Sequence, residues 1–417
     1  MVPAETKMRS ENLSSDDPGR TNWMVVFLIL VGVAIALLPV VFQLSAPADV
    51  RMGAGFVYLP AILVAVLCYA LDRFPTRKEK IHTLLLCVVL AFLTTYLHVW
   101  MVDLGQYFQG HSNLEWQLFT HKLVLELSPN IPPHSYRFLP NSLVRLFEQV
   151  SGDFVSARDG YRNLFGVLFF YSFYRLARLF LRHGGSLICL PLLAVVLPVS
   201  FRFFGQLTDP LSHLSFILAF VFIETEQFVY LLLAVTIGCL AKETIVAMAG
   251  YYVLFRWCEK SFLWKSALLI VASVAVYAMA RIAVLRGLPG YEQISGVGSE
   301  HILNNWNDYG NWLPGLLYTL GIFVPFVIAG WQKSPWTLRT LAIYWLPVLL
   351  VSGLFFSWLR EARNYVPLAA ILVILTVYHL MPAERTESIR DVAIVSSGPK
   401  SRGPGRLGSR KLKRLQR

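Results

Sequence analysis

Long apolar segments constrain the fold of this chain more than any other feature. About a dozen of them occur between Trp23 and Met381. A helix needs about 20 apolar residues to cross a bilayer, so each segment is a predicted span or part of one. With 56% hydrophobic residues and a mean hydropathy of +0.55, the chain is too apolar for an ordinary soluble core. We therefore expect an all-α, polytopic transmembrane helix bundle.

Charged residues, prolines and glycines set the limits of the predicted spans. The segments between residues 186 and 257 are short and closely spaced, so one or two of them are expected to be broken or re-entrant. This gives about 11–12 spans. The segments are 23–43, 55–71, 82–102, 161–180, 186–203, 211–224, 228–241, 243–257, 262–284, 312–331, 338–358 and 364–381. The first follows 22 polar residues without an A-x-A cleavage site, which predicts a retained span.

Lysine and arginine predict which loops are cytoplasmic. They cluster after the second, fourth, eighth, tenth and twelfth predicted spans, which predicts that both termini are in the cytoplasm. These residues are Arg73, Arg77, Lys78 and Lys80; Arg175, Arg178 and Arg182; Arg256, Lys260 and Lys265; Lys333 and Arg339; and the basic tail. We expect a cytoplasmic tail at 1–22, a membrane domain at 23–381 and a disordered cytoplasmic tail at 382–417. The net charge of +12 is attributed to attraction to anionic lipids and not to nucleic-acid binding.

The outer side then carries two long loops, 103–160 and 285–311. Within the first, Leu143, Leu146, Phe147 and Val150 repeat at i, i+3, i+4 and i+7, which predicts an amphipathic helix. A looser stripe of the same kind runs from Trp116 to Leu127. Such helices lie flat at the membrane interface. No internal repeat and no separate soluble domain are evident in the sequence.

Ionisable residues stand at the ends of several predicted spans, where charge is costly and usually functional. Asp103 ends the third span and could act as a general base toward a hydroxyl or amine. It could equally be a charge that stops the span at the headgroups. Arg137 lies between Tyr136 and Phe138 in the outer loop. Its guanidinium could donate two parallel hydrogen bonds to a phosphate, or it could bind lipid headgroups.

Two further positions place charge beside apolar sequence. Asp209 precedes Pro210 at the start of the sixth span, which suits a catalytic residue and equally an ordinary helix start. Lys242 and Glu243 separate two short spans. If buried, such a pair must be mutually neutralised or must meet the charge of a ligand. We expect Lys242 to be a point charge for a phosphate and Glu243 to orient it.

The segment Arg-Glu-Ala-Arg-Asn-Tyr at 360–365 precedes the last span. On a helix, Arg360 and Arg363 would share a face and, with Glu361 between them, form an anion-binding subsite. The alternative is that both arginines snorkel to the interface. Taken together, the charges at the outer ends of the spans predict a site that holds a phosphate and moves a proton.

Motifs for nucleotides and metals are absent from the sequence, which has no P-loop, no GxGxxG at a strand-to-helix turn and no HExxH. His111, His121 and His134 of the outer loop are expected to be surface or interfacial residues. The five cysteines lack the spacing of a metal site. No cofactor is predicted; a divalent cation (Mg or Mn) would be compatible with phosphate chemistry, but no dense carboxylate cluster requires one.

The chain resembles the GT-C glycosyltransferase superfamily, specifically the bacterial membrane enzymes that transfer mannose or aminoarabinose from polyprenyl phosphate. The resemblance rests on Asp103, on the Tyr-Arg-Phe-Leu-Pro string at 136–140, on Asp209-Pro210, on Ala-Lys-Glu-Thr at 241–244 and on the motif at 360–365. It spans most of 100–381, and each motif is short.

The resemblance implies an integral-membrane glycosyltransferase. It would move a sugar from a polyprenyl-phosphate donor to a lipid, glycan or protein acceptor on the non-cytoplasmic face of the bacterial inner membrane. Basic residues hold the leaving phosphate in that family, which implies a clamp of Arg137, Lys242, Arg360 and Arg363. Neither the sugar, the acceptor nor the oligomeric state can be read from the sequence.

A carboxylate in the first large outer loop activates the acceptor in that family, which implies Asp103 as the base. Here that loop follows the third span, where the family has it after the first, and Asp103 is followed by Leu104 in place of a second acidic residue. Glu115 and Asp209 are therefore alternatives for the base.

Rival functions remain open at this stage. A transporter or flippase of a lipid-linked sugar would place polar pairs near the middle of the membrane and could show inverted repeats. A polysaccharide polymerase or ligase would use a similar outer arginine site. A non-catalytic assembly protein would use the same charges only to bind lipid.

Overall fold

The computed structural model describes residues 77–101, 113–127, 134–200, 206–256, 261–284 and 299–382. In this part of the chain 87% of the residues are helical and no strand occurs, so the all-α prediction is confirmed there. The first two predicted spans, Asp103 and the basic tail lie outside the described residues.

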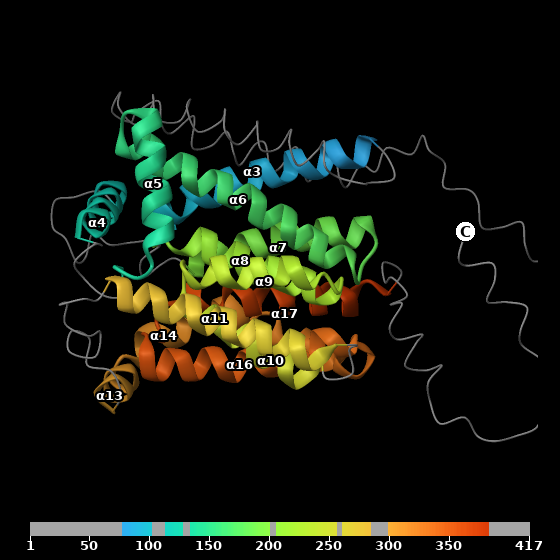
Figure 1. Cartoon of the computed structure of the whole chain (residues 1–417). Helices are drawn as coiled ribbons and strands as arrows, with labels where there is room; N and C mark the ends of the chain where they lie inside the picture. Colours follow the sequence, from blue (N-terminus) through green and yellow to red (C-terminus); the bar gives the residue numbers. More distant parts are fainter. Residues whose placement is uncertain are drawn as a thin grey trace, which may run out of the picture.

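Most of the long helices run side by side along one axis (Figure 1). They are α3 (Arg77–Met101), α6 (Phe154–Arg178), α7 (His183–Ser200), α8 (Asp209–Glu224), α9 (Phe228–Cys239), α10 (Ala247–Phe255), α11 (Phe262–Val284), α16 (Trp336–Phe356) and α17 (Val366–Leu380). In the part of the chain that the structure describes, three helical stretches are long and apolar enough to cross a membrane, namely Phe262–Ile282, Trp336–Phe355 and Ala362–Leu380. Shorter apolar helices are Lys80–Thr95, His183–Leu197, Phe228–Cys239 and Glu243–Phe255.

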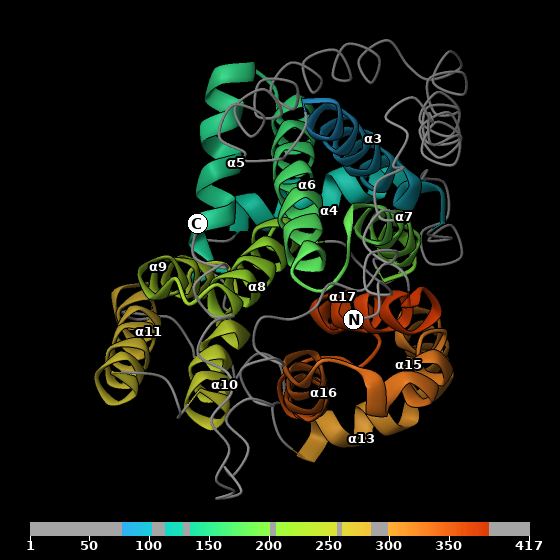
Figure 2. The ribbon, with the colours of Figure 1, turned by 90° about the vertical axis from the view of Figure 1, so that its right-hand side faces the viewer.

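The helix α17 lies inside the bundle, whereas α11 lies at its edge. Every residue of α17 from Val366 to Val377 is buried, and the helix packs against α7, α8, α16 and α15 (Val324–Gly330) (Figure 2). A helix that is apolar on all sides suits such a position. By contrast, α11 exposes Leu263, Val271 and Ile282, an apolar outer surface that lipid would cover.

The predicted span 312–331 is not one regular helix. It comprises α14 (Tyr309–Leu316), a π-helical turn (Leu317–Gly321) and α15. Pro325 lies in the first turn of α15, and proline cannot donate the backbone hydrogen bond that a continuous helix would need. The break therefore follows from the sequence, although the apolar pattern alone did not reveal it.

Three helices gather at one end of the bundle: α4 (Asn113–Leu127), α5 (Phe138–Ser151) and α13 (Ser299–Asn307) (Figure 1). The helices α4 and α5 occur where helical segments of the long loop were predicted, and their place at a membrane interface stays a prediction. The opposite end of the bundle holds the C-terminal end of α6, with Arg175 and Arg178, and the start of α16. The segments predicted to be outer loops and those predicted to be cytoplasmic loops therefore lie at opposite ends of the bundle.

A buried polar network attaches α4 to α6. Arg158 is 1% exposed and donates hydrogen bonds from Nε to His121 Nδ1 (2.9 Å) and from its terminal nitrogens to Gln117 (3.3 Å) and Asp159 (2.5 Å). Because a buried charge needs partners, the network determines how α4 packs. His121, expected at the surface or interface, is buried and structural.

Candidate functional site

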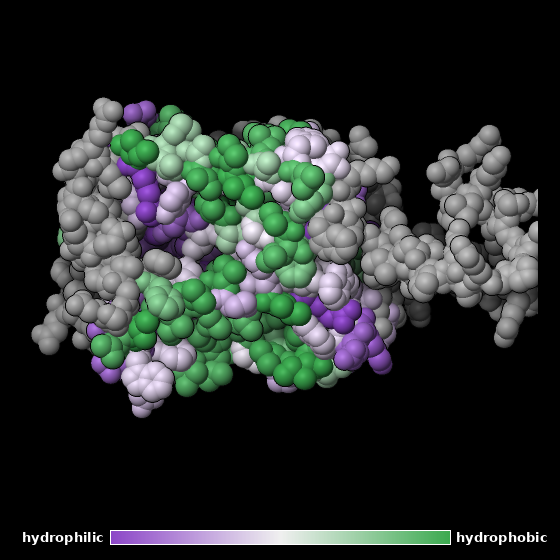
Figure 3. Space-filling model, turned by 60° about the horizontal axis from the view of Figure 1, so that its bottom comes forward, coloured by the Kyte–Doolittle hydropathy of each residue, from purple (hydrophilic) through white to green (hydrophobic). Residues whose placement is uncertain are grey.

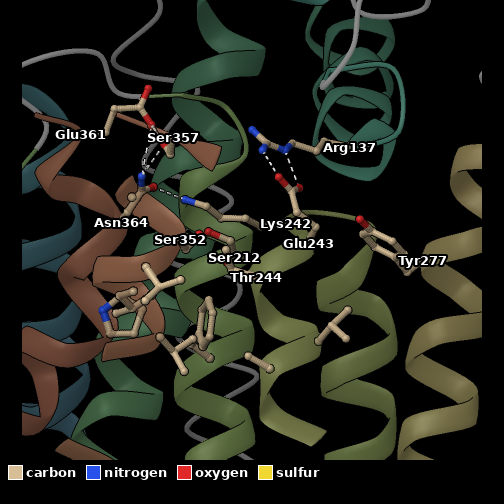
Figure 4. Close-up of a pocket in the computed structure, with 18 of the residues that line it drawn as sticks. Arg137, Ser212, Lys242, Glu243, Thr244, Tyr277, Ser352, Ser357, Glu361 and Asn364 are labelled. Atoms are coloured by element: carbon tan, nitrogen blue, oxygen red, sulfur yellow. Dashed lines mark hydrogen bonds and ion pairs between the residues drawn. The ribbon is translucent and has the colours of Figure 1, made fainter. Parts of the chain in front are cut away.

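A cavity of about 900 Å³ opens at the end of the bundle where α4, α5 and α13 gather. Its walls come from segments far apart in the sequence: the turn before α5, the start of α8, the 3-10 turn η1 (Glu243–Val246), the ends of α11 and α16, and the start of α17. Charged and polar side chains converge at one end of the cavity, with apolar side chains beyond them (Figure 4).

A buried ion pair lies behind the cavity wall. Asp209, in the first turn of α8, is 1% exposed, and its Oδ2 lies 3.3 Å from Nε of Arg363. The same oxygen accepts the backbone N–H of Gln206 at 2.7 Å. Asp209 Oδ1 lies 4.0 Å from Nζ of Lys242. One carboxylate thus faces two cations from segments far apart in the sequence, Lys242 before η1 and Arg363 in the 3-10 segment before α17, and the contacts connect the start of α8 to both segments.

Lys242 occupies the cavity wall between α9 and η1. Its ammonium group donates a hydrogen bond to the side-chain oxygen of Asn364 (Figure 4). Burial, together with Arg363 and Arg137, lowers the pKa of Lys242 to about 8, although Asp209 and Glu361 raise it. With a pKa of about 8, Lys242 is charged at neutral pH and loses its proton just above it, because burial penalises the charged ammonium.

Glu361 joins the same cluster from the turn before α17. Its Oε1 lies 2.9 Å from Arg363, and its Oε2 accepts hydrogen bonds from Ser357 (2.9 Å) and Asn364 (3.2 Å). Burial alone would raise the pKa of Glu361, but Arg363, Lys242 and these hydrogen bonds outweigh it and lower the pKa. Glu361 is therefore a fixed anion in the cavity wall.

Arg137 and Glu243 form a bidentate pair across 106 residues of sequence. Arg137 donates from Nε to Glu243 Oε2 at 2.8 Å and from a terminal nitrogen to Oε1. Figure 4 shows the two side chains facing each other at the rim of the cavity. The pair connects the outer turn to the start of η1. Glu243 was expected to orient Lys242, but it binds Arg137.

Arg281 stands at the outer end of α11 between two aromatic rings. The guanidinium carbon lies 4.5 Å from the ring centre of Tyr136 and 4.3 Å from that of Tyr277. All three residues line the cavity. Its Nε is buried without a hydrogen-bond partner, and none of the carboxylates described forms an ion pair with it.

Arg360 does not join this cluster. It pairs with Asp308 at 3.5 Å and stacks on Trp358 at 4.4 Å, and it is not among the cavity-lining residues. The expectation that Arg360 and Arg363 share a helical face is wrong, because Arg360 lies in a turn before the short 3-10 segment Ala362–Tyr365.

The candidates for a base lie in different places. Glu115 is exposed on α4, and Asp209 lies behind Lys242 and Arg363 and does not line the cavity. Asp103 lies outside the described residues, so its assignment stays a prediction. No group of His, Cys, Asp or Glu that could hold a metal ion occurs within the described ranges.

His134 and His213 also line the cavity. The sequence did not predict either histidine as a site residue. Burial, followed by Arg137 and Arg363, lowers the pKa of His134 to about 4, so this ring is neutral at physiological pH. His213 contacts the backbone oxygen of Arg363 at 2.9 Å. Neither has a spacing motif; His134 lies only three residues before Arg137, which is the one local signal.

Apolar residues make up much of the remaining cavity lining. Val274 of α11 and Val351 of α16 line the cavity and are 48% and 49% exposed. The short helix α10 packs against both α11 and α16 and fills the space between them in the other half of the bundle. Figure 3 shows a hollow with a hydrophilic floor, framed by hydrophobic residues.

Comparisons with known proteins assign no class to this arrangement. No family model matches the chain, and no curated protein or solved structure matches it either. The function must therefore be inferred from the cavity itself.

Proposed function

We propose that this chain is a polytopic membrane glycosyltransferase, of about 11–12 spans, that moves a sugar from a polyprenyl-phosphate donor to an acceptor on the non-cytoplasmic face of a bacterial inner membrane. The three helical stretches long enough to span a membrane and the apolar outer surface of α11 support the membrane location. The resemblance to the GT-C superfamily supports the reaction class.

The observation that carries the proposal is the two-part character of the cavity. Lys242, Arg137 and Glu361 lie at one end of the cavity (Figure 4), and its lining also includes apolar residues such as Val274 and Val348. A lipid that carries a phosphate has the same division, with a charged head and an apolar tail. The exposed valines on α11 and α16 mark where the tail could enter from the bilayer, so that the donor need not cross water.

Glycosyl transfer from a lipid phosphate can be catalysed by cations that are already fixed in place beside the leaving phosphate. An oxygen of the acceptor attacks the anomeric carbon of the sugar, the bond from that carbon to the phosphate oxygen breaks, and polyprenyl phosphate leaves with the bonding electron pair. The acceptor proton passes to a base. Cations fixed near the leaving oxygen stabilise the charge that develops there. Lys242, held by Asn364 and balanced by Asp209, is placed to supply one such charge.

The proposal keeps Asp103 as the predicted base. Asp209 is better suited to hold Lys242 and Arg363 in place than to meet an acceptor, because it is buried against these two cations and does not line the cavity. Glu361 and Glu243 line the cavity, but each already accepts from an arginine. Asp103→Asn should therefore abolish transfer while leaving donor binding intact.

The test uses purified protein in sealed proteoliposomes with a radiolabelled polyprenyl-phosphate sugar and a mixture of candidate acceptors. Wild type is compared with Lys242→Met and with Arg339→Gln, a control at the opposite end of α16. Transfer by wild type and the control, but not by Lys242→Met, supports the proposal. Movement of labelled lipid between leaflets without sugar transfer would establish a flippase in its place.

A further inference from the structure

The charges around the cavity nearly balance. Four cations take part, Arg137, Lys242, Arg281 and Arg363, against three carboxylates, Glu243, Glu361 and Asp209. Arg137 forms an ion pair with Glu243. Arg363 forms ion pairs with Asp209 and Glu361. Lys242 lies near Asp209. Among the described residues, one positive charge is left over, and it resides on Arg281.

Arg281 is held in place without being neutralised. The rings of Tyr136 and Tyr277, at 4.5 and 4.3 Å from its guanidinium carbon, restrict the plane of the guanidinium through cation–π contacts. A guanidinium fixed by its faces keeps its N–H edge available, and this edge matches two phosphate oxygens. The side chain is thus preorganised to bind an anion, with little further loss of conformational entropy.

The position of Arg281 relates this charge to the apolar wall. Val274, Tyr277 and Arg281 are spaced i, i+3 and i+7 along α11 and all line the cavity, so they form one helical face. Along that face the surface changes from an exposed valine to an aromatic ring and then to a cation. A lipid tail lying along Val274 would bring its headgroup toward Arg281.

We propose that Arg281, clamped by Tyr136 and Tyr277, is the residue that binds the phosphate of the lipid donor, and that the cavity selects a monoanionic phosphodiester. The inference rests on the proposed function, and it moves the main phosphate contact away from Arg137 and Arg363. Those two arginines are occupied by carboxylates of the protein and act as positioning residues. The single uncompensated positive charge of Arg281 matches the single negative charge of a phosphodiester. A diphosphate would carry more than one negative charge into the cavity.

The test measures anion preference directly, without a sugar. The Kd of farnesyl methyl phosphate, a monoanionic phosphodiester, and that of farnesyl methyl ether, its neutral counterpart, are determined by thermophoresis in nanodiscs. The ratio of the two values is compared among wild type, Arg281→Gln, Arg281→Lys and Arg339→Gln. Arg339 is the matched control, since it stacks on Trp336 at 5.6 Å but does not line the cavity. Thermal unfolding verifies that each variant is folded.

Arg281→Gln should reduce the preference for the phosphodiester by about 10- to 100-fold, the usual worth of hydrogen bonds to a charged group. Arg281→Lys should recover part of it, and Arg339→Gln should behave as wild type. A preference that survives in Arg281→Gln overturns the inference and leaves the proposed function standing. Wild type with no preference overturns both. A preference that depends on Arg281, in a protein that transfers no sugar, overturns the proposed function alone.

Discussion

Nε of Arg363 lies 3.3 Å from Oδ2 of Asp209, in an ion pair that is almost wholly removed from solvent. Arg363 lies in the 3-10 segment just before α17, and Asp209 begins α8; the two helices are far apart in the sequence and adjacent in the bundle. The pair therefore joins the innermost helix to the cavity wall, and its first role is to hold the site together.

Removing one member of this pair should destabilise the protein. Asp209→Ala removes one of the carboxylates that pair with Arg363 and also removes the carboxylate that faces Lys242. Breaking a buried pair costs about 3–5 kcal/mol, because an uncompensated charge remains. We expect thermal unfolding in detergent to show a clearly lower Tm for Asp209→Ala, with Asp153→Ala as a control at an exposed helix cap. Equal Tm values with activity abolished would indicate a catalytic residue and not a structural one.

Donor binding should weaken as the pH rises through about 8, the pKa of buried Lys242. Above that value the lysine becomes neutral and no longer attracts a phosphate. Since the pKa of Lys242 in the folded state lies below the ordinary lysine pKa of 10.5, the unfolded chain binds the proton more tightly between pH 8 and 10.5. The contribution of Lys242 to stability should accordingly increase from pH 8 to 10.5, while affinity falls.

The measurement for this prediction is the Kd of farnesyl methyl phosphate from pH 6.5 to 9.5. Lys242→Met should bind the lipid more weakly at pH 7 and should show a flat profile over that range. A variant that retains the wild-type pH dependence would assign the titration to another group.

Gly238 should be intolerant of a side chain. A Cβ atom there would lie 2.4 Å from Ile245 Cδ1 and 2.9 Å from Ser215 Cβ. The segment after Gly238 carries Lys242, whose backbone N–H donates to Gly238 O at 2.8 Å. Overpacking costs about 1–3 kcal/mol, so we expect Gly238→Ala to lower both Tm and donor affinity. Gly310→Ala is the matched control, with no atom within 4 Å of its Cβ.

His134 should contribute an acid-sensitive component to stability. Burial lowers the pKa of His134 to about 4 from the ordinary histidine pKa of 6.5, so the unfolded chain takes up a proton first as the pH falls. The stability associated with neutral His134 is present above pH 6.5 and declines between 6.5 and 4. Tm measured over this range should fall less steeply in His134→Gln than in wild type. Parallel curves would show that other groups account for the acid sensitivity.

Local sequence predicted much of the helical content and part of the site. The residues Arg137, Lys242, Glu243, Glu361 and Arg363 do meet, because each interrupts apolar sequence at the same end of the bundle. Arg360 does not, because the residues around it form a turn and a 3-10 segment, for which α-helical spacing does not hold.

The pairing of charges could not be predicted from sequence. The partners Arg137 and Glu243 are 106 residues apart, and the rings around Arg281 come from the outer turn and from α11. Such contacts depend on how helices pack. Consequently the sequence indicated a cluster of cations, while only the structure distinguishes neutralised arginines from the uncompensated Arg281.

Release of polyprenyl phosphate from its sugar in a single turnover is the most direct measurement of the central claim. Purified wild type, Asp103→Asn, Lys242→Met and Arg339→Gln would each be mixed in excess over a radiolabelled donor together with a pool of membrane glycan and lipid acceptors. The products would be separated by chromatography. The account predicts cleavage by wild type and Arg339→Gln and none by the other two. Intact donor with every protein, despite tight binding of the lipid, would contradict it.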